Sequence, residues 1–353
     1  MSVKKILSAA ESIIKLFIIL ILFNSNSKAQ EDNIKHYSND MGTLAIMYHR
    51  FNEHKYPSTN IQMDVFENQI KIIQQLNFKF YNPSDFQKNF EFPKKEKKIL
   101  ITIDDAFSSF YKNAWPLFKE KKIPFILFVS TEAVGKPGYM SWKQIKEIEK
   151  TNFGYIGNHS HTHKYLVDLT KKDFLNDIKR ANEIFIKEIG YNPKYFSYPF
   201  GEYNNYIKNY ISQNFDFAFG QHSGVIDINK NKYELSRFPI NEKYGDINRF
   251  KFLINLQPLQ FKAMYPENKM INNKNNPPNF SVEFFKDQKN LKNINCFSDE
   301  GNKWEKSNIS IKNNTLTILF RDKFLFRRGR INCSLNDEGI WRWFGVQFSV
   351  KKY

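Results

Sequence analysis

The sequence predicts an α/β barrel followed by a small all-β domain. Strand-like apolar runs alternate with segments of helical periodicity about seven times between residues 43 and 255, as in barrels built from βα units. One such run, residues 99–103, leads directly into Asp104 and Asp105, and polar groups at the carboxyl end of a strand are typical of barrel active sites. After residue 279, apolar and polar residues alternate, which indicates half-buried strands.

The first 29 residues resemble a secretory signal peptide and are excluded from the fold. Lys4 and Lys5 precede an apolar segment, residues 13–23, that is too short for an ordinary membrane span, and residues 27–29 fit a small-x-small cleavage site. An uncleaved membrane anchor is the alternative. In either case we expect export, to the periplasm or out of the cell.

The net charge of +17 at pH 7 comes from Lys residues that are spread through the chain together with Asn. No nucleic-acid-binding motif accompanies this charge, so we expect no nucleic-acid partner. A basic surface would still favour association with anionic glycans of the cell envelope.

Residues 30–264 form the predicted barrel domain. Its expected strands cover residues 43–48, 99–103, 125–129, 155–156, 195–198, 217–219 and 235–238, and its expected helices cover residues 66–76, 110–121, 142–149, 174–189 and 206–215. Ser141 is a suitable N-cap for the third of these helices, and Gly190 is a suitable end for the fourth.

Residues 265–279 are rich in Asn, Lys and Pro and predict a linker, and residues 280–353 predict the small β domain. Asn313 and Asn314 indicate a tight turn between two of its strands. The two cysteines, Cys296 and Cys333, either form a disulfide, as is common in exported proteins, or remain two buried thiols. The aromatic residues at 341–345 suit sugar stacking, although such a cluster more often lies in a core or a domain interface.

Asp104 and Asp105 can divide the work of a hydrolytic site, since one carboxylate can hold a metal ion while the other accepts a proton. Alternatively, they begin a turn or cap the next helix. Three of the seven histidines, His159, His161 and His163, lie within five residues. Two imidazoles and one carboxylate make a ligand set that suits a catalytic divalent ion, and a solvated polar turn is the alternative.

Taken together, these motifs resemble the NodB-homology polysaccharide deacetylases, carbohydrate esterase family four. The family's Thr-Phe-Asp-Asp-Gly motif stands here at residues 102–106, its His-Ser/Thr-x-x-His motif at residues 159–163, and its Arg-x-Pro-Tyr motif, altered, at residues 197–200. The resemblance covers about residues 43–255 and extends to exported bacterial chitooligosaccharide deacetylases. It implies a distorted (β/α)7 barrel, NodB-like, and metal-dependent removal of acetyl groups from polymers of N-acetylglucosamine.

The resemblance also implies roles for individual residues. Asp105, His159 and His163 would hold the metal ion, most often Zn²⁺, and Asp104 would be the general base. The metal and the backbone N–H of Phe200 would stabilise the oxyanion. A further set would contribute to substrate binding: Tyr198, Pro199 and Trp142.

Two departures from the family pattern leave roles to be filled. Ser197 stands where the family carries an Arg that orients the base, and Arg237 is the expected substitute from another strand. The Leu-x-His motif that supplies the general acid is absent, because no His follows His222. We expect His222 to replace it, with His49 as the second choice.

The predicted activity is therefore N-deacetylation of an acetylated glycan. A catalytically weak carbohydrate-binding homologue that keeps the metal is one alternative, although a retained base at Asp104 argues against it. An O-acetyl esterase or small-amide hydrolase on the same scaffold is another. The sequence names neither the polymer nor the acetyl position.

Overall fold

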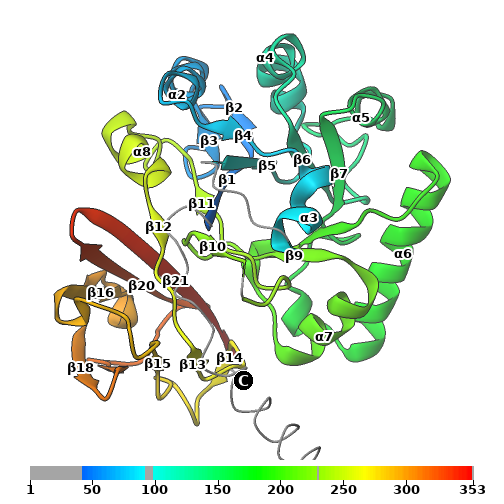
Figure 1. The fold of residues 1–353 in the computed structure, drawn as a ribbon. Coiled ribbons are helices and arrows are strands. Elements are labelled where there is room, and N and C mark those ends of the chain that lie inside the picture. The colour runs from blue at the N-terminus through cyan, green and yellow to red at the C-terminus, as the bar shows by residue number, and fades with distance from the viewer. Residues whose placement is uncertain (1–41, 92–97, 229, 352–353) are drawn as a thin grey trace, which may run out of the picture. The chain divides into compact units, whose positions relative to one another are not determined.

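The structure is a computed structural model that describes residues 42–91, 98–228 and 230–351. The predicted signal peptide, residues 1–29, lies outside the described residues. The described residues pack as one compact unit that contains a curled parallel sheet, its surrounding helices and two further sheets (Figure 1).

The parallel sheet has the strand order β10-β1-β5-β6-β7-β8-β9, with β11 also on β1 and β4 also on β5. Apart from β10, which is antiparallel, these strands run parallel to their neighbours, and the sheet curls into a half-barrel (Figure 1). The bounds are β1 Gly42–Tyr48, β4 Lys79–Phe80, β5 Lys98–Ile103, β6 Phe125–Val129, β7 Gly154–Asn158, β8 Tyr195–Ser197, β9 Phe217–Phe219, β10 Ile226–Asp227 and β11 Phe238–Pro239. This arrangement confirms the predicted barrel-like α/β fold.

Helices cover the outside of the half-barrel (Figure 1). They are α2 Met63–Gln75, α4 Trp115–Lys121 after the π-helical turn η2 Phe110–Ala114, α5 Trp142–Glu149, α6 Lys171–Ile189, α7 Asn205–Asn214 and α8 Ile247–Ile254. The short helix α3 Phe86–Glu91 instead lies within the curl of the sheet, where Phe86 packs on Phe217 and Phe219 of β9 (Figure 1). In α6, Phe174, Ile178 and Phe185 recur at helical spacing and are buried, so one apolar face packs inward. This helix begins at the N-cap Thr170 and ends at Gly190, whose left-handed φ of 86° suits glycine.

The central strands β5 and β6 are buried almost throughout, as expected for parallel strands covered on both faces. β6 separates β5 from β7, and β8 follows β7 in the sheet. Because these strands are parallel, the segments that follow them open on the same rim. The rim thus collects Asp104 and Asp105 after β5, His159 after β7 and Ser197 at the end of β8.

The C-terminal part is all-β, as predicted. Its sheets, here called the C-terminal sheets, have the orders β12-β21-β20-β16-β17, with β14 on β21, and β13-β15-β19-β18. The bounds are β12 Gln257–Pro258, β13 Ala263–Tyr265, β14 Met270–Asn272, β15 Ser281–Glu283, β16 Ile294–Ser298, β17 Glu305–Lys306, β18 Asn308–Lys312, β19 Thr315–Leu319, β20 Arg328–Asp337 and β21 Ile340–Lys351. Three of these strands, β12, β13 and β14, come from ranges expected to be barrel and linker, and β12 and β14 pair with β21.

Two local features follow from the sequence of the C-terminal sheets. Asn313 and Asn314 join β18 to β19 with φ values of 47° and 60°, the left-handed conformation that tight hairpin turns require and Asn tolerates. Cys296 and Cys333 face each other across β16 and β20 and form a disulfide, which resolves the alternative left open by the sequence.

The aromatic residues at 341–345 lie where β21 meets the half-barrel. The Trp343 ring lies 6.2 Å from that of Phe238 in β11, and the Trp341 ring lies 5.7 Å from that of Phe252 in α8. The cluster therefore forms an internal junction, the commoner of its two expected roles.

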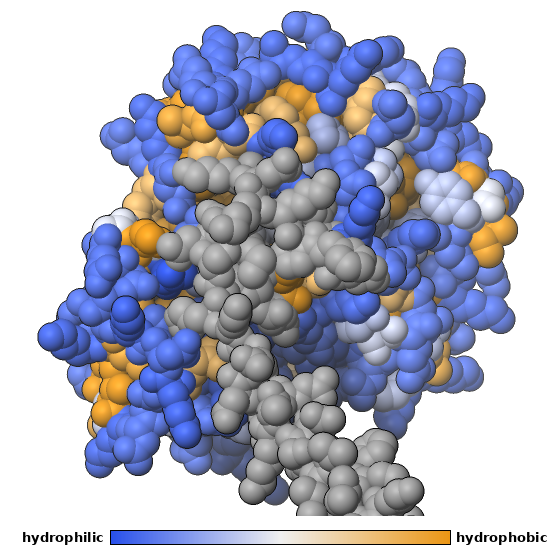
Figure 2. All heavy atoms as spheres, viewed as in Figure 1, coloured by the Kyte–Doolittle hydropathy of each residue, from blue (hydrophilic) through white to orange (hydrophobic). Residues whose placement is uncertain are grey.

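No helix among the described residues is long and apolar enough to cross a membrane. On the face shown in Figure 2, hydrophilic side chains predominate and hydrophobic ones form separate patches.

Candidate active site

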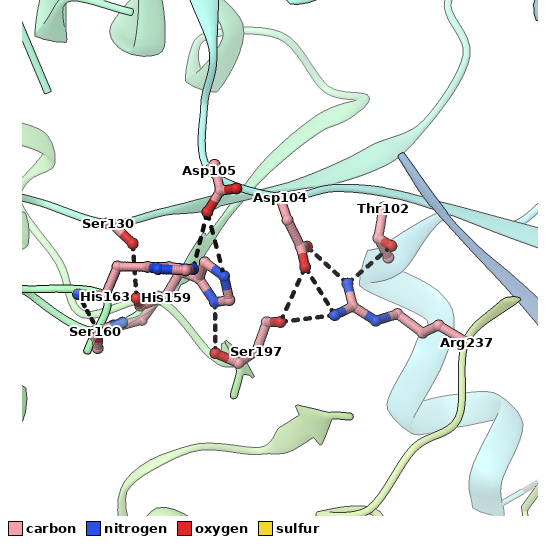
Figure 3. Close-up of polar contacts among 10 residues, drawn as sticks. Thr102, Asp104, Asp105, Ser130, His159, Ser160, His163, Ser197 and Arg237 are labelled. Carbon is pink, nitrogen blue, oxygen red and sulfur yellow. Dashed lines mark hydrogen bonds and ion pairs between the residues drawn. The ribbon is translucent and has the colours of Figure 1, made fainter. Parts of the chain in front are cut away.

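Asp105, His159 and His163 gather at the carboxyl-end rim of the half-barrel (Figure 3). The Oδ1 atom of Asp105 lies 3.5 Å from Nε2 of His159 and 3.2 Å from Nε2 of His163. Ligand atoms that share a tetrahedral zinc ion at ordinary bond lengths lie about 3.4 Å apart. The side chains thus stand at the separations that a divalent ion requires.

The hydrogen bonding of His159 leaves one ring nitrogen for a metal. Nδ1 lies 2.7 Å from the carbonyl oxygen of Ser197, which can only accept, so Nδ1 carries the proton. Nε2 is buried and has no hydrogen-bond partner among the described residues. Burial lowers the pKa of His159 to about 4, which keeps the ring neutral. A neutral imidazole fixed through its other nitrogen is the usual form of a histidine ligand, so these residues fit a metal ion.

The backbone around the cluster is strained. Asp105, Ala106, Ser160 and His163 have φ values of 72°, 53°, 66° and 53°, in the left-handed region that non-glycine residues rarely occupy. Each such residue costs on the order of 1–3 kcal/mol, and such conformations concentrate at functional sites. Ala106 stands where the family motif has Gly, so the strained conformation persists here without the residue best suited to it.

Asp177, from the buried face of α6, holds the histidine loop in this conformation. Its carboxylate accepts hydrogen bonds from the backbone N–H groups of His161 (2.8 Å) and Thr162 (3.1 Å) and from the Thr162 hydroxyl (2.5 Å). The His161 ring instead pairs with Thr131, 2.8 Å from Nδ1 to the hydroxyl oxygen. Sequence reasoning missed Asp177, although an acidic residue beside Ile178 on the apolar face of a helix was a usable signal.

Asp104 forms a bidentate ion pair with Arg237, with N–O distances of 2.7 and 2.9 Å (Figure 3). All five guanidinium N–H groups have acceptors, which are both Asp104 oxygens, the Thr102 hydroxyl, the Ser197 hydroxyl and the Gly220 carbonyl. Arg237 reaches the site just before β11, on the far side of β1 from β5. The structure thus brings Arg237 to Asp104, while Ser197 occupies the family's Arg position and supports the same guanidinium.

The two adjacent carboxylates differ in their partners. Burial would raise the pKa of Asp104, but the charges of Arg237, His159 and His49 bring it below its ordinary value. For Asp105, burial acts in the same upward direction, and its contacts with His163 and His159 lower the pKa far below the ordinary range. Both groups are therefore ionised at neutral pH. Asp104 is held by a fixed cation, and Asp105 is hydrogen-bonded by His163.

The structure separates the two histidines considered as general acids. His49 follows Tyr48, whose carbonyl accepts from the Asp104 N–H at 2.9 Å, so it lies beside the end of β5, and its charge lowers the pKa of both Asp104 and Asp105. His222 instead borders a hollow of about 420 Å³ where the half-barrel meets the C-terminal sheets. There its pKa is lowered to about 4, chiefly by burial, and the charges that act on it come from Glu234, Lys269 and Arg237. The structure does not bring His222 to the metal-ligand cluster.

Of the residues expected to contact substrate, Phe200 adjoins the cluster. Its ring lies 4.7 Å from that of His163, and it has a left-handed φ of 60°. Tyr198 is fully buried and donates a hydrogen bond to the Tyr233 carbonyl at 3.1 Å. The other two expected residues also pack internally, Pro199 as a buried residue and Trp142 edge-on against the Phe185 ring at 5.9 Å.

The fold and the site resemble those of polysaccharide deacetylases, and residues 92–215 match the family of that description. This match confirms the resemblance predicted from the three motifs.

Several individual deacetylases are similar to this chain. A poly-beta-1,6-N-acetyl-D-glucosamine N-deacetylase of Staphylococcus aureus (strain MSSA476) is 24% identical over 230 residues, which cover 56% of this chain and 79% of the relative. Among solved structures, the Streptococcus pyogenes deacetylase PplD in complex with acetate aligns at a TM-score of 0.55 and 18% identity, covering 60% of this chain and 98% of that one. IcaB from Ammonifex degensii aligns at 0.54 and 23% identity, covering 60% and 97%. The structural likenesses show a shared fold and leave a large part of this chain unmatched.

Proposed function

We propose that this chain is a metal-dependent hydrolase that removes N-acetyl groups from an N-acetylglucosamine-containing polysaccharide or oligosaccharide. The observation that carries the proposal is the pairing of two arrangements on one rim. An ionised base, Asp104, is fixed by Arg237, and beside it stands a set of divalent-ion ligands, Asp105, His159 and His163. A protein that only binds glycans has no use for the first arrangement.

Asp105, His159 and His163 are the residues that would hold the metal, and two nitrogens with one oxygen suit Zn²⁺. When bound there, the ion supplies a water of lowered pKa and polarises the acetamide carbonyl. Asp104 accepts the proton of the attacking water, and Arg237 keeps its carboxylate charged and aimed. The backbone N–H of Phe200 donates to the oxygen that becomes negative.

We assign the proton that the leaving amine needs to His49 rather than to His222. An amine departs poorly unless it is protonated, so an acid must stand near the reacting carbon. His49 lies within electrostatic reach of both carboxylates, whereas two of the three charges that act on His222, Glu234 and Lys269, line the separate hollow. Histidine is also the side chain that most often transfers protons in enzyme reactions.

The disulfide between Cys296 and Cys333 supports the proposal of export, because such bridges persist in oxidising compartments. An exported enzyme would meet an extracellular or cell-envelope glycan as its substrate.

The test is acetate release from purified protein, with and without a chelator. The panel is poly-β-1,6-N-acetylglucosamine, chitooligosaccharides, peptidoglycan fragments and an O-acetylated glycan. We expect chelator-sensitive release from at least one N-acetylated polymer and none from the Asp104→Asn variant. Release from the O-acetylated glycan alone would replace the proposal with an esterase, and release that resists both the chelator and Asp104→Asn would refute the assigned site.

A further inference from the structure

We propose that Gln347 in β21 and Arg327 directly before β20, both from the C-terminal part, are positioning residues of the active site. They hold the Phe200 turn (residues 198–202), which carries the backbone N–H assigned to the oxyanion. This inference rests on the proposed function and extends it. It makes the C-terminal sheets part of the catalytic apparatus, where the sequence predicted a separate appended domain.

Gln347 fixes the backbone of the turn directly. Its Nε2 group donates to the Phe200 carbonyl oxygen at 2.9 Å, and the side chain is only 6% exposed. Gln347 lies in β21, which pairs with β20 over ten residue positions, so its donor projects from a well-supported strand. A hydrogen bond to the carbonyl restrains the peptide plane that follows Phe200, where φ is already held at 60°. This plane adjoins the one that carries the Phe200 N–H, and the φ of 60° and ψ of 7° at Phe200 set the angle between the two planes.

The turn has little freedom to find this conformation by itself. Gly201 has a φ of 69°, and a Cβ atom there would lie 2.5 Å from the backbone nitrogen of Gln221. Two amides are used within the turn, since Gly201 donates to the Tyr198 carbonyl at 2.8 Å and Glu202 donates to the Pro199 carbonyl at 3.2 Å. Strained conformations of this kind persist only when the surroundings over-determine them.

Arg327 holds the far end of the turn. Its guanidinium pairs with the fully buried Glu202, 3.0 Å from NH2 to Oε2, and with Asp168, 2.8 Å from NH1 to Oδ2. The same group lies 3.6 Å from the centroid of the Tyr165 ring. That ring stacks on Phe200 at 3.9 Å, and Phe200 in turn packs on the ligand His163. A continuous series of contacts therefore runs from β20's leading edge to the metal-ligand cluster.

The experiment compares Gln347→Leu with Arg342→Met. Arg342 lies earlier in the same strand, donates to the backbone carbonyl of Pro258 in the neighbouring strand β12 at 3.4 Å, and pairs with Asp337. For Gln347→Leu we expect kcat to fall about ten- to a hundredfold, because small misplacements and lost oxyanion donors act on this scale. The loss should be equal on an acetamide and on an activated aryl acetate, since both develop an oxyanion. KM and bound metal should stay near wild type, and Arg342→Met should keep the wild-type kcat.

Arg327→Met should weaken the same step, and Arg327→Lys should restore part of it, because one ammonium can pair with Glu202 without spanning both carboxylates. Backbone amide exchange at residues 200–202 gives a readout that does not depend on acetate release, and it should speed up in Gln347→Leu but not in Arg342→Met. A wild-type kcat in Gln347→Leu, or an equal loss in Arg342→Met, would overturn the inference. If the wild-type protein deacetylates nothing, the proposed function fails, and unchanged amide exchange in Gln347→Leu would overturn the positioning role separately.

Discussion

Arg237 and Asp104 form an ion pair in which neither side chain is exposed to solvent, and every N–H group of the guanidinium donates a hydrogen bond. Arg237→Met leaves the Asp104 carboxylate buried without its cation, and removing one partner of such a pair costs about 3–5 kcal/mol. We therefore expect a large drop in the free energy of unfolding, measured in urea. The Asp104 pKa should also rise, because the cation that lowers it is gone, so the acidic limb of the pH–rate profile should move toward neutral pH.

Arg237→Lys is the matched control for the Arg237 prediction. It keeps the positive charge but cannot donate to both carboxylate oxygens in one plane. An intermediate stability and an intermediate shift of the acidic limb are expected, whereas a pH–rate profile unmoved in both variants would contradict the role of Arg237.

Asp104→Asn should abolish acetate release while the protein keeps its metal. The amide nearly matches the carboxylate in shape but accepts no proton, and a general base contributes about 10²–10⁴ in rate. Metal analysis and kcat are measured on the same preparation, below the variant's own melting temperature. Near wild-type turnover would place the base elsewhere.

The double variant His159→Ala with His163→Ala should lose the divalent ion, because two of the three proposed ligand side chains are removed. His161→Ala is the control within the same loop, since its ring pairs with Thr131 and is not one of the three clustered ligands. Metal content by elemental analysis should be near zero in the first protein and unchanged in the second. Equal stoichiometry in wild type and the double variant would remove the assignment.

His49→Ala should lower turnover of an acetamide by about 10²–10⁴ and leave an activated aryl acetate nearly unaffected, because an aryl oxide departs without a proton. His222→Ala should leave both rates close to wild type, since its neighbours are Glu234 and Lys269. The opposite pattern in the two variants would return the general-acid role to His222. A loss of activity on the acetamide alone also differs from the equal losses on both substrates that are expected for Gln347→Leu.

The metal-free protein should lose stability as the pH falls from about 6.5 to 4. Burial lowers the pKa of His159 to about 4 from 6.5, so the unfolded chain binds this proton first and acid favours unfolding. Between pH 6.5 and 4, protonation of His159 lowers the free energy of unfolding by about 3 kcal/mol. The pKa of His222 is also lowered to about 4, so its protonation lowers the free energy of unfolding further. The pKa of His163 is raised in the folded protein, so its stabilising contribution is fully present below pH 6.5 and does not change as the pH falls further.

Urea unfolding of the metal-free protein at several pH values measures the slope of the free energy of unfolding against pH. His159→Gln and His222→Gln should each flatten it. A slope that neither substitution changes would mean that other groups carry the acid sensitivity.

Much of the half-barrel could be predicted because its signals are local. The apolar run at residues 125–129 and the caps at Ser141 and Gly190 each specify their element within a few neighbouring residues. The metal-ligand set was also local in origin, since two short motifs follow two strands of one parallel sheet. The partner of Asp104 was harder to predict, because Arg237 lies 133 residues away in the chain and only the order of strands in the sheet brings it close.

The remaining features depend on long-range packing that periodicity does not report. Nothing in the residues around His222 shows that its loop lines another hollow. Likewise, nothing around Gln347 indicates that its donor meets Phe200, 147 positions earlier in the chain. The residues expected to touch substrate, Tyr198 and Trp142, were aromatic residues near motifs, and their burial depends on neighbours such as Tyr233 and Phe185.

The position of β21 along the chain has a consequence for biosynthesis. β21 is the last strand of the described residues and pairs with β12, β14 and β20, while also presenting Gln347 to the Phe200 turn. A ribosome delivers every strand of the half-barrel before it delivers this one, and domains generally assemble in the order of synthesis. If Gln347 has the proposed role, a chain that is only partly synthesised or translocated has its metal ligands, but its oxyanion donor is not yet held in position. The full catalytic rate would then be reached only when β21 has emerged and docked.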